Sequence, residues 1–104
     1  MRSLELGFTK VTDVGLRELS GLKSLHWLNL ADTRVTDAGL KELAALKTLT
    51  RLSLSRTGVT DAGLKELGGL NDLAELDLSG TRVSDAGVKE LQRALPSCKI
   101  AKNP

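Results

Sequence analysis

The string VTDAGLKEL occupies residues 35–43 and occurs again, letter for letter, at residues 59–67. Two close copies, VTDVGLREL and VSDAGVKEL, begin at residues 11 and 83, so that a constant step of 24 residues separates the four strings. Self-similarity at a fixed period between about 20 and 50 residues is typical of a solenoid. This period divides the chain into the units 1–24, 25–48, 49–72 and 73–96 and a C-terminal strand stub, 97–104.

Each unit has two halves with different hydrophobic periods. The first half places leucine at alternate positions, as in LHWLNL, LTRLSL and LAELDL, which predicts a short strand with one buried face. The second half places Leu40, Leu43 and Leu46 at helical spacing, which predicts a helix of two to three turns. A single unit of this size cannot bury its own apolar face, whereas stacked units share a continuous core. The sequence therefore predicts an α/β solenoid.

The shared pattern L-x-x-L-x-L-x-x-T-x-V-T-D-A-G-L-x-E-L resembles the leucine-rich repeat. Its second half is similar to the helical subclass of ribonuclease-inhibitor-like and F-box-type proteins and of many bacterial repeat proteins. The resemblance implies one leucine-rich-repeat domain over residues 1–104, a short horseshoe arc with parallel strands on its concave face and helices on its convex face. Threonine departs from the family pattern by occupying the usual asparagine position, where it would tie neighbouring loops together only partly (Thr9, Thr33, Thr57 and Thr81).

The repeated string is interpreted as scaffold. Its Thr or Ser precedes each helix and is expected to cap it, at about 1 kcal/mol per cap (Thr12, Thr36, Thr60 and Ser84). Its Asp is expected to meet the positive end of the helix dipole, in preference to the alternative of a row of metal ligands (Asp13, Asp37, Asp61 and Asp85). Its Gly is unfavourable within a helix, which suggests a close backbone contact between stacked units (Gly15, Gly39, Gly63 and Gly87).

Composition restricts the classes of function. The formal net charge of +2 over 104 residues is too small to indicate nucleic-acid binding. The chain contains no long apolar run of the kind that spans a membrane, and its N-terminus does not have the pattern of a signal peptide. The single Cys98 cannot form an internal disulfide. We therefore expect a cytoplasmic location, with neither a nucleic acid nor a membrane among the partners.

An enzymatic role is not expected. The chain has one histidine, His26, and one cysteine, Cys98, and the repeat places them three strands apart, on the order of 14 Å. This separation is too large for a thiol–imidazole pair. We expect His26 at the surface and Cys98 half-buried. No cofactor or metal motif is present in the sequence.

The residues between the buried leucines differ from unit to unit and are expected to face outward in three columns. The columns are Ser3, Trp27, Arg51, Glu75 and Lys99; Glu5, Asn29, Ser53, Asp77 and Ala101; and Gly7, Ala31, Ser55, Ser79 and Asn103. Exposed Trp and Arg are enriched in binding hot spots, and Arg51 could stack on Trp27. The predicted partner-binding residues are Trp27, Asn29, Arg51, Ser53, Glu75 and Asp77. The charged row could equally be a self-satisfied surface ladder.

Two further surfaces are possible interaction sites. A modest basic rim follows the strands beside Phe8, unless it serves only solubility (Lys10, Arg34, Arg56 and Arg82). The first unit lacks a segment to cover Leu4, Leu6 and Leu16, which suggests either missing upstream sequence or a partner at this edge.

The leading hypothesis is non-catalytic binding of a protein or peptide on the concave face. The alternative is a structural or assembly module, or a fragment of a larger array such as the substrate-recognition part of an F-box-type ubiquitin ligase. Such a module would stack, or self-associate, through its N-terminal edge.

Overall fold

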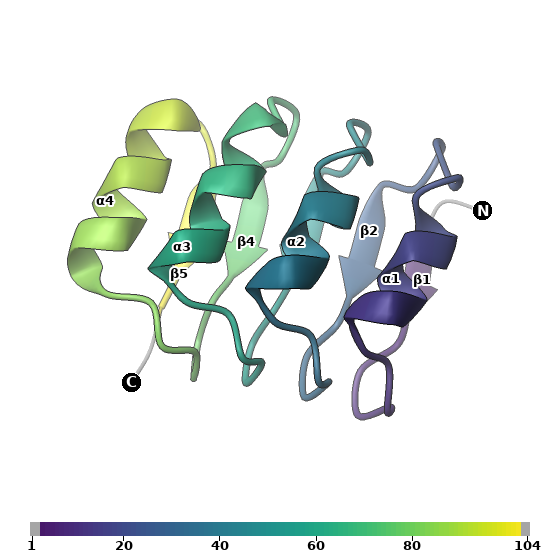
Figure 1. Ribbon diagram of the computed structural model, residues 1–104. Helices are drawn as coiled ribbons and strands as arrows, with labels where there is room; N and C mark the ends of the chain where they lie inside the picture. The colour runs from purple at the N-terminus through teal and green to yellow at the C-terminus, as the bar shows by residue number, and fades with distance from the viewer. Residues whose placement is uncertain (1–2, 103–104) are drawn as a thin grey trace.

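Five short strands lie side by side in one parallel sheet, in the order in which they occur along the chain (Figure 1). The computed structural model describes residues 3–102, so that Asn103 and the outermost ends of the first unit and of the C-terminal stub lie outside the described residues. The strands are β1 (Ser3–Glu5), β2 (Trp27–Asn29), β3 (Arg51–Ser53), β4 (Glu75–Asp77) and β5 (Lys99–Ala101). Each central residue pairs with the residue 24 positions later, which aligns the column Leu4, Leu28, Leu52, Leu76 and Ile100.

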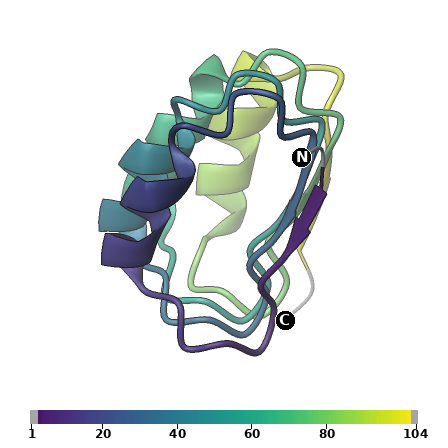
Figure 2. The same ribbon diagram turned by 90° about the vertical axis from the view of Figure 1, so that its right-hand side faces the viewer.

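The helices form a second layer on the side opposite to the sheet. Figure 2 shows the two layers edge-on. They are α1 (Asp13–Leu19), α2 (Asp37–Leu43), α3 (Asp61–Leu64), the 3₁₀ helix η1 (Lys65–Gly69) and α4 (Asp85–Ala94). Strand and helix alternate once per unit, and successive helices pack on one another. The predicted α/β solenoid, with its strands on one face and its helices on the other, is confirmed.

The core is a stack of leucines between the two layers. In the second unit Leu28, Leu30, Leu40, Leu43 and Leu46 are all fully buried. Burial of one such side chain contributes roughly 1.5–3 kcal/mol to folding. The leucine spacing that defines the repeat in the sequence is therefore the main source of stability.

The helical segment of the third unit is divided into the short helix α3 and the 3₁₀ helix η1, which begins at Lys65. Gly68 and Gly69 end η1, at the positions where the second unit has Ala44 and Ala45. Glycine is about 1 kcal/mol less favourable than alanine in a helix. The last helix has no such glycines and continues to Ala94.

Hydrogen bonds from one unit to the next replace most of the predicted helix caps. The backbone N–H and the hydroxyl of Thr36 donate to the Asp13 carboxylate at 2.8 and 2.5 Å. Thr60 donates in the same way to Asp37 at 2.7 and 2.5 Å. Ser84 donates to Asp61 at 2.8 and 2.6 Å. Each carboxylate thus joins its own helix to the start of the next one.

The predicted side-chain caps are wrong for the three threonines. Thr12, Thr36 and Thr60 occupy the N-cap position, but none of their hydroxyls accepts a hydrogen bond from the helix that follows. Only the Ser84 hydroxyl does so, from the Gly87 N–H at 3.1 Å. The hydroxyls of Thr36 and Thr60 donate to the aspartate of the preceding unit, and Ser84 shows that such a donation and a cap can occur on the same hydroxyl.

The aspartates begin their helices as expected, but the dipole accounts for only part of their role. Their oxygens accept hydrogen bonds from the following unit, which explains the row of carboxylates without a metal ion. Asp85, in the last unit, instead meets the Lys102 ammonium at 3.3 Å. The hydroxyl and the backbone N–H of Ser84 lower the pKa of Asp61 below its ordinary value.

The repeated glycines make room for these carboxylates. A Cβ atom on Gly39 or Gly63 would lie 2.3 Å from a carboxylate oxygen of the preceding unit, and one on Gly87 would lie 2.1 Å away. The predicted contact between units is therefore present, but its partner is an aspartate side chain and not the backbone. A Cβ on Gly15 would meet only the Val11 side chain, at 4.0 Å.

Threonine at the family's asparagine position closes the turn within its own unit. The hydroxyls of Thr33 and Thr57 are buried and donate to the carbonyl groups three residues earlier, each at 2.7 Å. Backbone bonds such as Gly58 N–H to Val35 carbonyl, at 2.9 Å, connect neighbouring loops instead.

The N-terminal edge is partly covered. Leu16 is fully buried, contrary to expectation, because α1 packs on α2. Leu4 and Leu6 remain half-buried, as an open edge implies.

We predict opposite effects of one substitution at two equivalent positions. Gly63→Ala should reduce the free energy of unfolding by about 1–3 kcal/mol, since the methyl group would overlap the Asp37 carboxylate and the Leu40 side chain. Gly15→Ala should leave it unchanged or raise it by up to about 1 kcal/mol. Urea denaturation at neutral pH measures both. Equal losses in the two variants would contradict the role assigned to glycine.

We also predict an acid-sensitive contribution from Asp61. Its pKa in the folded chain lies below its unfolded value, so its contribution is complete above about pH 5 and is lost as the pH falls through the folded pKa. Asp61→Asn should therefore reduce the dependence of stability on pH between about pH 5 and pH 2. Asp85→Asn is the matched control, because Asp85 accepts no hydrogen bond from a following unit. Denaturant titrations at several pH values should show a larger flattening for Asp61→Asn than for the control.

Candidate functional site

The outward face of the sheet contains a hollow of about 450 Å³. Side chains at the third and fifth positions of the units line it, and the buried Leu52 and Leu76 contribute to its base. All six predicted partner-binding residues belong to this lining: Trp27, Asn29, Arg51, Ser53, Glu75 and Asp77. The parallel register brings them together, because equivalent residues of neighbouring units pair with each other on adjacent strands.

The third positions form a row of interacting side chains. The Arg51 guanidinium carbon lies over the Trp27 ring, 5.9 Å from its centroid. On its other side the Arg51 Nε donates to Glu75 Oε2 at 2.6 Å, with side chains 60% and 52% exposed. An ion pair this exposed contributes little to stability, on the order of 0–1 kcal/mol. It does hold the guanidinium against the indole. Lys99 is paired in register with Glu75 but forms no ion pair within residues 3–102.

The fifth positions supply oriented polar groups. The Asn29 amide donates to Glu5 Oε1 at 2.5 Å and accepts from the Ala31 N–H at 2.9 Å, which fixes its orientation. Asp77 accepts from the Ser79 N–H through one carboxylate oxygen, at 3.0 Å. The hollow thus offers an indole, a guanidinium and carboxylates side by side.

The seventh positions form the predicted third column with two buried members. Ala31 and Ser55 are buried, with 8% and 7% of their surface exposed. Gly7 and Ser79 are partly exposed, and a Cβ on Gly7 would lie 3.3 Å from the side-chain nitrogen of Asn29, a residue of the outward face. The third column is therefore less exposed than the other two.

The eighth residue of each unit adopts a left-handed backbone conformation. The φ angles are 62° at Phe8, 58° at Asp32, 53° at Arg56 and 74° at Gly80. Only glycine adopts this conformation without strain, and for a bulky residue it is unusual. Phe8 is in addition 78% exposed, so that its aromatic ring gains little from burial.

The predicted basic rim is interrupted by an acidic residue. Lys10, Arg34 and Arg82 are exposed, but the Arg56 guanidinium binds both oxygens of Asp32, at 2.6–2.8 Å. This contact lowers the pKa of the Asp32 carboxyl and raises that of Arg56, through the hydrogen bond first and the charge second. One of the four predicted cations is therefore already paired.

Cys98 and His26, the two residues considered for covalent chemistry, lie in different surroundings. Cys98 is buried more deeply than expected, with 4% of its surface exposed. Burial, with a smaller contribution from the Glu75 carboxylate, raises the pKa of its thiol, which favours the unreactive protonated form. His26 is partly exposed, and its Nδ1 donates to the Ser24 carbonyl at 2.7 Å. Residues 3–102 contain no group of three His, Cys, Asp or Glu side chains that could hold a metal ion.

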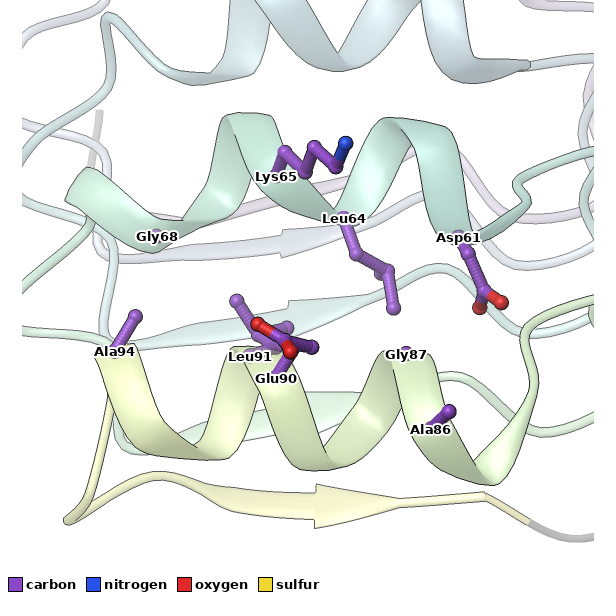
Figure 3. A pocket seen from close by; sticks show the side chains of 9 residues that line it. All are labelled: Asp61, Leu64, Lys65, Gly68, Ala86, Gly87, Glu90, Leu91 and Ala94. Carbon is purple, nitrogen blue, oxygen red and sulfur yellow. The ribbon is translucent and has the colours of Figure 1, made fainter.

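A second hollow, of about 600 Å³, lies between the last two helices on the opposite face (Figure 3). Leu64 and Asp61 extend from α3 toward α4, where Gly87 and Ala94 leave space (Figure 3). The Asp61 carboxylate already accepts hydrogen bonds from Ser84. The hollow therefore results from small residues at a helix contact more than from polar groups that point toward one another.

Four consecutive segments match the leucine-rich-repeat family, at residues 1–20, 21–44, 45–68 and 70–91. The chain belongs to the leucine-rich-repeat family. Among solved structures it is similar to a leucine-rich-repeat protein of Leptospira interrogans, with 28% identity and a TM-score of 0.76 over 96% of this chain and 25% of that one. It is also similar to internalin C2 of Listeria monocytogenes, with 30% identity and a TM-score of 0.80 over 96% of this chain and 40% of that one.

A plant peptide hormone receptor solved in complex with RGF2 shares the fold, at 15% identity and a TM-score of 0.62 over 99% of this chain and 17% of that one. The repeat chain thus spans less than half the length of each of these structures. No curated protein matches the sequence. None of the helices within residues 3–102 has the length and apolar character needed to cross a membrane.

Sequence reasoning missed two features of this leucine-rich-repeat surface. It did not predict the left-handed conformation at the eighth positions, although Gly80 offered a hint of it. It also missed the ion pair between Asp32 and Arg56. These two residues lie 24 positions apart, which is one repeat period, and that spacing was a signal that they lie on neighbouring units.

We predict that Phe8→Gly stabilises the fold. Glycine relieves the left-handed strain, and the exposed ring gives up little buried area, so the free energy of unfolding should rise by about 0.5–1 kcal/mol. Arg56→Gly is the control, because it relieves the same strain but removes the pair with Asp32. Urea denaturation of both variants measures the difference. A loss of stability in Phe8→Gly would show that the ring packs more tightly than its exposure indicates.

Proposed function

We propose that this leucine-rich-repeat chain is a non-catalytic protein- or peptide-binding module that uses the outward face of its sheet. The observation that carries the proposal is the partly exposed Trp27 at one end of a hollow, with Arg51 held over its ring. Leucine-rich repeats commonly bind proteins, and the plant receptor with the same fold is in complex with RGF2.

The arrangement of these side chains favours high affinity for a ligand, because the surface is preorganised for binding. Trp27 offers a large, rigid apolar area, and Trp and Arg are the residue types most enriched in binding hot spots. The bond from Arg51 to Glu75 and the bonds of the Asn29 amide favour one orientation of these groups before a ligand arrives. Less side-chain entropy is then lost on binding.

The ligand that fits best is an extended segment lying across the strands. The lining residues come from β2, β3, β4 and β5, so the hollow runs from unit to unit. Carboxylates and cations alternate along this direction, which suits a polar or mixed-charge peptide with one aromatic or aliphatic anchor for Trp27. The exposed cations Lys10, Arg34 and Arg82 at the ends of the strands would extend the contact as a secondary rim.

The proposal also includes the subclass of the repeat, its biological context, its location and its lack of catalytic activity. The T-x-V-T-D-A-G-L pattern supports the helical, ribonuclease-inhibitor-like subclass with its 24-residue unit. A place in the substrate-recognition part of an F-box-type ubiquitin ligase rests on the repeat alone. A cytoplasmic location and the absence of catalytic activity are expected on the composition described above.

We predict that Trp27→Ala abolishes most of the binding. Peptides selected from a random displayed library against the immobilised chain provide the ligand, and isothermal titration calorimetry measures their Kd for each variant. Loss of a central Trp anchor should weaken binding by at least about tenfold, equivalent to about 1.4 kcal/mol or more.

Val14→Ala is the matched control, because Val14 is exposed on α1, in the helix layer, and should leave Kd unchanged. Circular dichroism and urea denaturation would verify that both variants are folded. The proposal is wrong if the selected peptides bind Trp27→Ala as tightly as the original chain, or if Val14→Ala weakens them equally.

A further inference from the structure

Two oppositely charged side chains in the hollow on the outward sheet face have no ion-pair partner within residues 3–102. They are Asp77 on β4 and Lys99 on β5. The other charged residues of the lining, Arg51 and Glu75, lie 2.6 Å apart and neutralise each other. The formal charge of the hollow is therefore zero, but it consists of one internal pair and two separate, opposite charges that a ligand can meet.

The Asp77 carboxylate stands between two small side chains. Ser53 on β3 and Ala101 on β5 are its partners in register on either side. One Asp77 oxygen accepts from the Ser79 N–H at 3.0 Å, and the other accepts no hydrogen bond within the described part of the chain. The hollow thus has room for a ligand side chain beside a carboxylate oxygen that is available as an acceptor.

Arg56, on the loop after β3, is not the main partner of Asp77. Its guanidinium binds both oxygens of Asp32, at 2.6–2.8 Å. The pKa of Arg56 is raised first by the hydrogen bond with Asp32 and least by the charge of Asp77. Since the pair of Arg56 with Asp32 has no net charge, it leaves the negative charge of Asp77 largely uncompensated.

Trp27, Asp77 and Lys99 lie on different strands, at spacings that an extended chain matches. Neighbouring strands are about 4.8 Å apart, so Asp77 and Lys99 lie roughly 10 Å and 14 Å from Trp27 across the sheet. In an extended peptide alternate side chains face the same way, which places three of them at roughly 0, 7 and 14 Å. The flexible stem of a lysine or arginine at the middle position covers the remaining ~3 Å.

We propose that the hollow selects an extended peptide with an apolar, a basic and an acidic residue at successive alternate positions. The apolar side chain lies on Trp27, the basic side chain reaches Asp77, and the carboxylate reaches Lys99. In either direction of the peptide the cation lies between the apolar anchor and the anion. This inference rests on the proposed peptide-binding function and adds the order of charges that the surface requires.

Asp77 and Lys99 are then specificity-determining residues, whereas Trp27 provides most of the affinity. A peptide with the two charges exchanged places its carboxylate against Asp77 and its ammonium against Lys99. Contacts between like charges disfavour a wrong partner without any change in apolar contact. The two peptides have the same composition and net charge, so a difference between them reports the order of the charges alone.

The test uses two heptapeptides with blocked ends and serine at the unspecified positions. The matched peptide has phenylalanine, lysine and glutamate at its second, fourth and sixth positions, and the exchanged peptide has phenylalanine, glutamate and lysine there. Heteronuclear NMR titration measures both Kd values, including millimolar ones. The matched peptide should bind at least about fivefold more tightly, because two ion pairs replace two repulsions. This ratio should shrink at about 0.5 M salt, where charges are screened.

A charge exchange in the protein should invert the preference. The double variant Asp77→Lys with Lys99→Asp should bind the exchanged peptide more tightly than the matched one. Asp77→Asn, which retains an oxygen for the Ser79 N–H, should lose most of the preference. The matched control is Asp72→Lys with Lys89→Asp, because both residues are exposed and neither lines the hollow. It should keep the original ratio, and circular dichroism verifies that every variant is folded.

Equal Kd values for the two peptides, or an unchanged preference in both Asp77 variants, would overturn the proposal. It is also overturned if neither heptapeptide binds at millimolar concentration while library-selected peptides bind and depend on Trp27. In that case the peptide-binding function stands and the order of charges fails. Selected peptides that bind Trp27→Ala unchanged would instead remove the function itself, so the two failures are distinguishable.

Discussion

The bond from an aspartate to the start of the next helix is the constraint on which the rest of this structure depends. Leucine burial supplies most of the stability and the parallel strands set the register on the sheet side, but neither joins the starts of neighbouring helices. The two hydrogen bonds from Thr36 to Asp13, and their equivalents in the next two units, are directional and charge-assisted. They fix the rotation of each unit on its neighbour, and glycine is required wherever the carboxylate enters.

The same constraint positions the candidate binding surface. The aspartate bonds join the same units whose parallel strands pair in register, so Trp27, Arg51 and Glu75 fall on adjacent strands and their side chains contact one another. None of these residues belongs to the repeated string. Repeated residues thus provide the scaffold, and variable residues at fixed positions on that scaffold provide the surface chemistry. This division explains how one repeat can serve many partners.

The fold was predictable because the leucine period is a strong signal that recurs four times. The strand residues of the candidate surface were predictable for the same reason, since the alternation of faces determines where Trp27 and Asn29 point. The structure departs from these predictions where bonding is not local. Thr36 was expected to cap its own helix, but its hydroxyl instead donates to Asp13, 23 residues away, and a pattern within one unit cannot reveal this partner. Ser55 was expected at the surface but is buried, because alternation of faces does not reveal how far neighbouring side chains cover a small residue.

Amide hydrogen exchange, observed residue by residue with NMR, tests the bond between units most directly. The account predicts that the amides of Thr36, Thr60 and Ser84 exchange slowly, because each donates to an aspartate of the preceding unit. The amide of Thr12, at the same position of the first unit, should exchange at nearly the rate of an unstructured chain. Four equally fast rates, or equal protection of Thr12, would contradict the account.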